Sequence, residues 1–246
     1  MNREFSFVTH NGLRLLVYLP WWNEGVLHGM TLRDLSFGGN DSDAAIADFC
    51  RATGVTALAN PKQTHSDLFY DLRSPETVAS MFAARGSLVR FAECDALLCS
   101  QGGAQGEGRV AFAVATADCV PVIVRGRTSW AVIHAGWRGL ANGILARVLH
   151  AIEAPLEAAI FAAAGGAAYE VGPEVVDAIG SSAAVVEARG DKILLDTAET
   201  AKNQLLPFLA PERVATSGVC TITDQRFHSY RRDGELAGRS LTFVAP

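Results

Sequence analysis

The sequence predicts one layered domain in which α-helices accompany mixed or antiparallel β-sheets. A series of short apolar runs has the composition of strands, and segments with helical periodicity separate some of them. Several runs follow one another with only a short turn between them, which favours hairpins over a strict βαβ repeat. The 246 residues contain no linker, internal repeat or low-complexity tract, so we expect a single domain over residues 1–246.

The predicted strands are rich in Val, Leu, Ile and Ala. They cover residues 14–19, 55–59, 95–100, 109–116, 120–124, 130–134, 158–164, 192–196 and 213–220. The glycine-rich stretch 100–110 lies between two of these runs, and it predicts a flexible hairpin loop whose length could modify access to a pocket.

The predicted helices lie between these strands. A helix over 42–54 has Ser42 or Asp43 as its N-cap and Gly54 as its stop. The others cover 75–86, which begins with a proline and ends with a glycine, 140 to about 153, and 197 to about 209.

Composition excludes several classes of protein. The net charge is -5 and no run of Lys or Arg is present, so we expect neither a nucleic-acid nor a membrane partner. No apolar run approaches a signal peptide or the ~20 residues of a membrane span, which predicts a cytoplasmic protein. The five cysteines are scattered without C-x-x-C pairs, which argues against a disulfide framework or a structural zinc knuckle. The sequence does not indicate an oligomeric state.

A predicted hairpin brings two reactive residue types together. A two-residue turn at Gly126 and Arg127 would join strands 120–124 and 130–134, and this register sets Cys119 directly opposite His134. Opposed side chains lie about 5 Å apart at Cβ, close enough to share a metal ion or a proton. The alternative is a buried cysteine and a hydrogen-bonded core histidine.

Polar and flexible residues follow both strands of this hairpin. Asp118 precedes Cys119, and we expect it to orient a ligand imidazole, to act as a general acid or base, or only to form a strand-end hydrogen bond. Gly136 and Gly139 flank Arg138 before a helix expected at about Leu140. Backbone N–H groups and a guanidinium there predict an anion site of phosphate size, unless Arg138 pairs with a carboxylate.

Other polar candidates lie elsewhere in the chain. His65 follows strand 55–59 in the loop NPKQTHSD. Tyr169 and Glu170 would line a pocket or cap a helix beginning near Pro173. The segment 227–239 places Tyr230 and Arg231 close to His228, Arg232 and Arg239. A ring there could stack on a base while an arginine holds a charged group, or the segment is a solvated basic turn.

Five motifs in order carry a resemblance to a known family: QTHSD, TADCVPV, HAGWRGL, AAYEVGPEV and FHSYRRDGELAGR. Together they resemble the YfiH-like proteins, also called the laccase-domain or multicopper polyphenol oxidase family. The resemblance runs from about His65 to Arg239, and more loosely through HGMTLRDLS. It implies an α+β fold of packed mixed sheets flanked by helices, with a metal site at His65, Cys119 and His134.

The chemistry of these three residues agrees with that implied site. Two neutral imidazoles and a thiolate give zinc three ligands and leave the fourth tetrahedral position open, which is typical of catalytic zinc. The same donors suit copper, so the sequence leaves zinc and copper as alternatives. The chain departs from its relatives at Ala167 and Ala168, where cysteine is usual, and this departure affects the expected substrate fit near Tyr169.

The resemblance implies a purine nucleoside phosphorylase that acts on adenosine, inosine and methylthioadenosine, with zinc-dependent adenosine deaminase as a second activity. The expected catalytic residues are His65, Asp118, Cys119 and His134, and the expected phosphate- and substrate-binding residues are Arg138, Tyr169, Glu170, Tyr230 and Arg231.

Three other functions stay open at this point. The first is a Cys/His hydrolase that cleaves an amide of a peptidoglycan precursor. The second is copper-dependent phenol oxidation, which needs roughly ten or more mostly histidine ligands where the chain has only six histidines. The third is a binding protein without catalysis.

Overall fold

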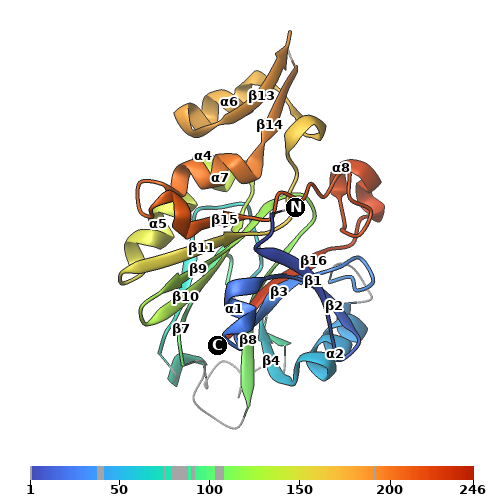
Figure 1. Ribbon diagram of the computed structural model, residues 1–246, viewed down its shortest axis with the longest axis vertical. Coiled ribbons are helices and arrows are strands. Elements are labelled where there is room, and N and C mark those ends of the chain that lie inside the picture. Colours follow the sequence, from blue (N-terminus) through green and yellow to red (C-terminus); the bar gives the residue numbers. More distant parts are fainter. Residues whose placement is uncertain are drawn as a thin grey trace.

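The structure is a computed structural model that describes residues 2–37, 42–74, 76–78, 88–89, 92–102, 108–190 and 192–246. Two large sheets lie at its centre, and a small three-stranded sheet stands at one end (Figure 1). The architecture confirms the expected α+β fold of packed mixed sheets flanked by helices.

The first large sheet is mixed. Its strands, in spatial order, are β1 (Phe5–His10), β2 (Leu13–Tyr18), β3 (Leu27–Thr31), β16 (Ser240–Ala245), β8 (Arg109–Thr116), β4 (Val55–Ala59) and β6 (Leu88–Val89). All neighbours are antiparallel except β4, which runs parallel to β8 and to β6.

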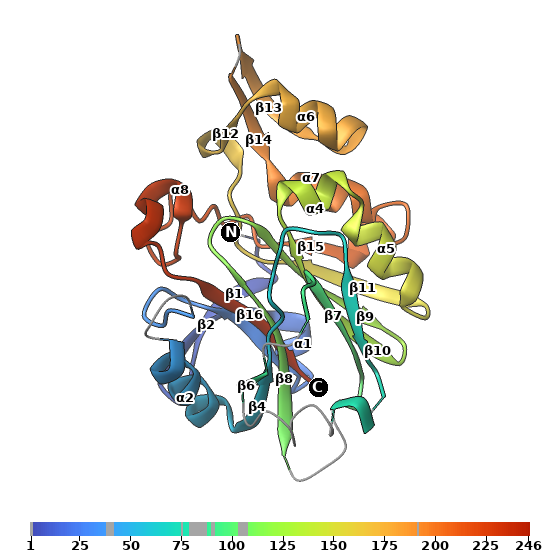
Figure 2. The ribbon, with the colours of Figure 1, turned by 180° about the vertical axis from the view of Figure 1, so that it is seen from behind.

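The second large sheet carries the predicted hairpin. Its strands, in order, are β15 (Val214–Thr216), β11 (Pro155–Ile160), β9 (Val120–Gly126), β10 (Ser129–Ala135), β7 (Ala96–Ser100) and β5 (Phe69–Leu72). The small sheet consists of β12 (Glu170–Val171), β14 (Lys192–Asp196) and β13 (Ala184–Arg189). It projects with α6 (Pro173–Ile179) beyond the two large sheets (Figure 2).

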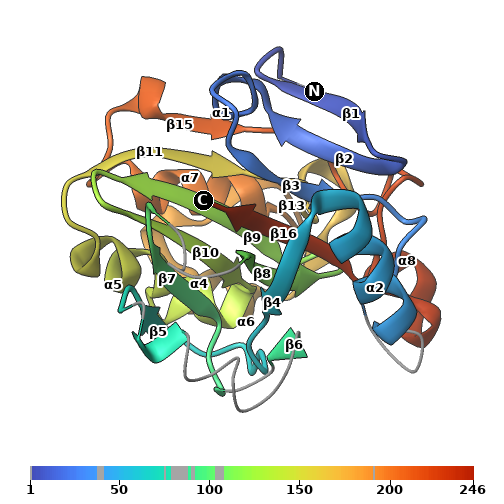
Figure 3. The ribbon, with the colours of Figure 1, turned by 90° about the horizontal axis from the view of Figure 1, so that it is seen from below.

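Helices flank the sheets. They are α1 (Leu19–Asn23), α2 (Ser42–Thr53), α4 (Trp137–Ala141), α5 (Ile144–Ala151), α7 (Thr197–Leu205) and α8 (Tyr230–Asp233), besides α6. The helix α2 packs on the first sheet, whereas α5 and α7 pack on the second. Figure 3 shows α2 and α5 on opposite outer sides of the molecule.

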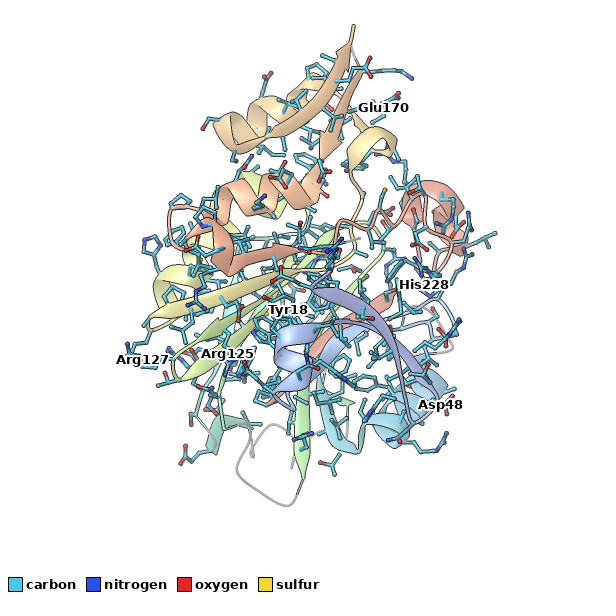
Figure 4. All side chains as sticks on the ribbon, in the orientation of Figure 1. Tyr18, Asp48, Arg125, Arg127, Glu170 and His228 are labelled. Atoms are coloured by element: carbon cyan, nitrogen blue, oxygen red, sulfur yellow. The ribbon has the colours of Figure 1, made fainter. Side chains whose placement is uncertain are left out.

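The main apolar core lies between the two large sheets. Trp21 from the first layer meets Trp130 from the second edge to face, with ring centroids 4.9 Å apart. Glu157 on β11 accepts hydrogen bonds from the Tyr18 hydroxyl (2.8 Å) and the Trp21 indole N–H (2.5 Å). Figure 4 labels Tyr18 at this junction. Packing and a partly buried acceptor together join the sheets that form the site.

Most predicted elements are present, with shifted bounds. Predicted strand 158–164 is β11, which begins and ends earlier, and 213–220 shortens to β15. Sequence reasoning missed β1, β3, β5, β6, β12, β13 and β16. The helix expected from 140 to 153 is two helices, α4 and α5, because Gly143 adopts a left-handed φ of 78° between them. Most of the expected helix 75–86 and the centre of the expected loop 100–110 fall outside the described residues.

The register of the predicted hairpin was wrong by two residues. Trp130 pairs with Arg125 and His134 pairs with Pro121, so the turn consists of Arg127 and Thr128. Gly126 is the last residue of β9, and a Cβ there would come 2.5 Å from Ile152 Cγ2. A shift of two leaves every side chain on its predicted face, and Cys119 remains beside His134.

Candidate active site

Three residues from separate segments converge at one end of the second sheet. His134 lies on β10, Cys119 directly precedes β9, and His65 comes from the loop after β4. Their ligand atoms all lie within 4.8 Å of one another, and the two imidazole centroids are 4.9 Å apart. The structure thus brings together the predicted metal ligands, which we call the ligand cluster.

A glycine leaves room for the ligand cluster. The corrected register places Gly136 beside Cys119, one step beyond the last pair of the ladder. A Cβ at this position would lie 3.0 Å from His65 Cδ2 and 3.1 Å from Cys119 Sγ. A side chain here would crowd two ligands, which favours the glycine of HAGWRG.

Asp95 organises the ligand cluster, and sequence reasoning missed it. Its fully buried carboxylate accepts hydrogen bonds from His134 Nδ1 (2.7 Å), His65 N (3.0 Å) and Ser66 N (2.6 Å). Because Nδ1 is engaged, His134 presents Nε2 to the cluster. The available signal was an aspartate directly before a buried strand that neighbours 130–134.

The same carboxylate stabilises an unusual backbone. His65 has a left-handed φ of 59°, a conformation that non-glycine residues rarely adopt. The amides of His65 and Ser66 both donate to Asp95, and this anchors the turn. One buried group therefore positions two of the three ligands.

Electrostatics favour a thiolate in the ligand cluster. Burial by itself would raise the pKa of Cys119, but the His134 and His65 imidazoles outweigh it and hold that pKa below the ordinary thiol value. Burial disfavours the imidazolium of His134, but the Cys119 thiolate and Asp95 raise its pKa. Burial also opposes the ionisation of Asp95, yet hydrogen bonds from His134 and Ser66 keep its pKa well below the usual range. A thiolate is the form that binds metals.

Of the alternatives for Asp118, the hydrogen bonds of its carboxylate fit the strand-end role and not the orientation of an imidazole. Its carboxylate accepts hydrogen bonds from the Thr221 hydroxyl (2.7 Å) and the Arg231 backbone N–H (2.6 Å). These contacts fasten the segment around α8 to the end of β8. Asp95 has the orienting position instead, because β7 pairs with β10 and brings it beside His134.

The ligand cluster opens into a cavity of about 640 Å³. Its walls include every predicted site residue except Glu170: His65, Asp118, Cys119, His134, Arg138, Tyr169, Tyr230 and Arg231. Phe37, Asn60, Pro61, Lys62, Gln63, Ala115, Thr116, Ala117, Trp137 and Arg239 complete the walls.

Glu170 lies outside this cavity, contrary to expectation. Its carboxylate pairs with Lys192 on the small sheet at 2.8 Å and lines a neighbouring cavity of about 330 Å³ (Figure 4). Tyr169 lies between the two cavities and lines both, whereas Glu170 lines only the smaller one. Gly172 caps α6, which starts at Pro173 as expected.

Arginines stacked on aromatic rings form the outer wall of the cavity. Arg138 lies 4.3 Å from the centroid of Trp137, Arg231 4.7 Å from that of Tyr169, and Arg239 6.0 Å from that of Tyr230. We call these six residues the arginine rim.

Arg138 is the freest cation of the arginine rim. Arg231 donates to the Glu170 carbonyl and Arg239 to two nearby carbonyls, whereas Arg138 has no carboxylate partner among the residues the structure describes. The helix α4 begins at Trp137, three residues earlier than expected. An exposed guanidinium that is unpaired among the described residues therefore lies on the cavity wall.

His228 and Arg232 do not line the cavity. Arg232 donates to the carbonyls of Thr221 (2.7 Å) and Phe227 (2.8 Å), and His228 Nε2 lies 3.0 Å from the Leu35 carbonyl (Figure 4). Both residues shape the loop that presents Tyr230 and Arg231.

Two further properties concern the described ranges as a whole. The ligand cluster is the one group of His, Cys, Asp and Glu found there that has the spacing to hold a metal. No helix within those ranges combines the length and apolarity that crossing a bilayer requires. All five cysteines are free.

Comparisons with known proteins place this geometry in a family. A family model described as multi-copper polyphenol oxidoreductase laccase matches residues 32–246. Proteins named purine nucleoside phosphorylase are 36% identical over 139 residues in Aquifex aeolicus and 38% over 143 residues in Escherichia coli K12, where the name adds YfiH. These alignments cover 55% and 54% of this chain, and 65% and 58% of the relatives, which is less than two thirds of their length.

Other matches extend over most of the chain. A purine nucleoside phosphorylase of Corynebacterium glutamicum is 30% identical over 216 residues, covering 84% of this chain and 83% of the relative. The crystal structure of YfiH from Bacillus licheniformis superposes with a TM-score of 0.81 at 20% identity, covering 99% of both chains. YlmD from Geobacillus stearothermophilus gives 0.80 at 21%, covering 98% of both. The chain therefore belongs to the multi-copper polyphenol oxidoreductase laccase family, which its motifs resemble.

Proposed function

We propose that this protein is a purine nucleoside phosphorylase acting on adenosine, inosine and methylthioadenosine. The observation that carries the proposal is one cavity that contains the ligand cluster, an unpaired guanidinium and several aromatic rings. The names of its relatives favour phosphorolysis over the amide hydrolysis and the phenol oxidation that the sequence left open.

The reaction needs a phosphate anion and a purine nucleoside bound side by side in one pocket. A phosphate oxygen attacks C1′ of the ribose, the C1′–N9 bond breaks, and the departing base takes up a proton. Arg138 offers several N–H donors that match the oxygens of a phosphate, and nothing described competes for them. Tyr169 and Tyr230 can stack on the flat base.

A metal ion fits the ligand cluster. His65, Cys119 and His134 would hold zinc, because two imidazoles and a thiolate within 4.8 Å of one another match its donor preference; copper accepts the same donors. When bound, the ion supplies Lewis-acid polarisation of an oxygen. Asp95 fixes the His134 ring in the orientation that such binding requires. We also propose adenosine deaminase as a second activity of this cavity.

The test is phosphate-dependent release of adenine from adenosine by the purified protein, with elemental analysis of bound zinc and copper. We expect Cys119→Ala to abolish release and Arg138→Ala to raise the KM for phosphate at least tenfold. Arg127→Ala, an arginine at the hairpin tip outside the cavity, is the matched control. Release without phosphate, or no release from metal-loaded protein, would overturn the proposal.

A further inference from the structure

One wall of the cavity lies where β4 and β8 end. Asn60 follows the last residue of β4, and Thr116 is the last residue of β8. Both line the cavity, and they are only 6% and 2% exposed. No step of the proposed reaction uses either residue, and sequence reasoning did not single them out.

The orientation of the Asn60 amide is determined by its surroundings. Asn60 Nδ2 donates to the carbonyl of Ala113 at 3.1 Å, and a carbonyl can only accept, so Oδ1 faces the other way. No described residue donates to Oδ1. Gln63 differs, because its Nε2 donates to the Ala115 carbonyl (2.8 Å) and its Oε1 accepts from the Ala115 N–H (2.7 Å).

Asn60 therefore offers an acceptor that the protein does not use. Asn60 lines the cavity, so a ligand that brings an N–H group to Oδ1 can donate a hydrogen bond to it. The Thr116 hydroxyl, three residues beyond Ala113 on β8, is buried without a partner among the described residues. This wall thus has unused hydrogen-bonding capacity for the polar edge of a ligand.

We propose that Asn60 Oδ1 accepts a hydrogen bond from the base of the substrate. It would select purine nucleosides with an N–H donor on the edge away from ribose, such as the 6-amino group of adenine or N1–H of hypoxanthine. Purine riboside, which has neither donor, would leave Oδ1 unsatisfied. The identity of the ligand rests on the proposed function, whereas the acceptor position rests on the structure.

The first experiment needs no variant. The wild-type protein is given adenosine and purine riboside, which differ only in the 6-amino group, and kcat/KM is measured for phosphorolysis of each. We expect adenosine to be favoured by about tenfold, as is typical for one buried hydrogen bond. Equal values for the two nucleosides would overturn the inference.

The second experiment locates the effect at Asn60. We expect Asn60→Ala to lower kcat/KM for adenosine by about tenfold and to change that for purine riboside less than twofold. Asn203→Ala is the matched control, because Asn203 Nδ2 also donates to a backbone carbonyl, that of Ser182 at 3.1 Å, outside the cavity. An equal fall with both nucleosides would overturn the assignment to Asn60.

Calorimetric binding to the metal-loaded wild-type protein separates the two proposals. Tighter binding of adenosine than of purine riboside without any phosphorolysis would support the Asn60 acceptor and overturn the proposed reaction. Phosphorolysis of both nucleosides at one rate would do the reverse. Binding of neither nucleoside would overturn both.

Discussion

The ligand cluster and the arginine rim share one cavity but are built in different ways. A buried group fixes the ligand cluster, because the fully buried Asp95 carboxylate accepts hydrogen bonds from the His134 ring and from the His65 N–H. The side chains of the arginine rim are positioned by stacking on aromatic rings and by hydrogen bonds to backbone carbonyls. The ligand cluster is therefore preorganised, whereas the arginine rim is able to adapt.

The two parts of the cavity differ in how accurately their side chains must be placed. Metal ligands must meet within narrow distances, and buried hydrogen bonds provide that accuracy. Anion recognition tolerates a movable guanidinium because charge attraction falls slowly with distance. Substitutions of the buried Asp95 should therefore affect both stability and metal binding, while those in the arginine rim should affect only ligand binding.

Removing the charge of Asp95 should have the largest effect. Asp95→Asn leaves a buried histidine and two backbone amides with a weaker acceptor, so we expect the free energy of unfolding to fall by about 4 kcal/mol. Metal affinity, measured by competition with a chelator, should fall roughly 10- to 100-fold. Asp71→Asn, which removes an exposed pair with Arg73, is the control. Unchanged metal affinity in Asp95→Asn would show that Asp95 does not position the metal ligands.

A second buried histidine, His28, differs from His134 because its pKa is lowered and not raised. His28 is fully buried, with no counter-ion in the part of the chain that the structure describes, and its Nε2 accepts from the Tyr18 N–H (3.1 Å) while Nδ1 donates to the Val26 carbonyl (2.8 Å). Burial lowers the pKa of His28 from 6.5 to about 4. Protonation would place an N–H against the Tyr18 N–H, so the folded state resists it.

The stability of the fold should therefore fall as the pH falls from 6.5 to about 4. In that interval the unfolded chain binds a proton at His28 and the folded chain does not, so unfolding is favoured by about 3 kcal/mol in total. Urea unfolding of the wild type and of His28→Gln between pH 7 and 4 measures this. The same pH slope in both proteins would rule out His28 as the source.

Filling the space beside His65 and Cys119 should have a moderate effect. Gly136→Ala places a methyl group 3.0 Å from His65 and 3.1 Å from Cys119, and we expect metal affinity to fall about tenfold. The backbone at Gly136 suits any residue, with φ -67°, so the stability of the metal-free protein should change by less than about 0.5 kcal/mol. A loss of metal-free stability instead would mean that the methyl group disrupts the strand rather than the ligands.

The smallest effect is expected in the arginine rim. Arg138→Lys keeps the charge but loses the planar fork and the stacking on Trp137, so the KM for phosphate should rise about three- to fivefold with kcat and stability unchanged. Arg127→Lys, the same substitution outside the cavity, is the matched control. A change in metal content of Arg138→Lys would contradict the independence of the two parts of the cavity.

The comparison also explains which parts of the site were predictable. His65, Cys119, His134 and Arg138 stand in motifs where polar residues interrupt apolar strands, and alternation along those strands kept Cys119 and His134 on one face despite the wrong register. Asp95, Asp118 and Glu170 could not be assigned in this way, because their partners lie on segments far away in the chain.

The amino-acid sequence by itself determined part of the strands, several helix boundaries and the residue types that meet at the ligand cluster, because these follow from local periodicity and turn chemistry. Only the tertiary structure decided which carboxylate supports His134, which arginine stays unpaired and which way the Asn60 amide points. Those outcomes depend on strand neighbours and on competition for hydrogen-bond donors between distant segments, and no local pattern encodes that competition.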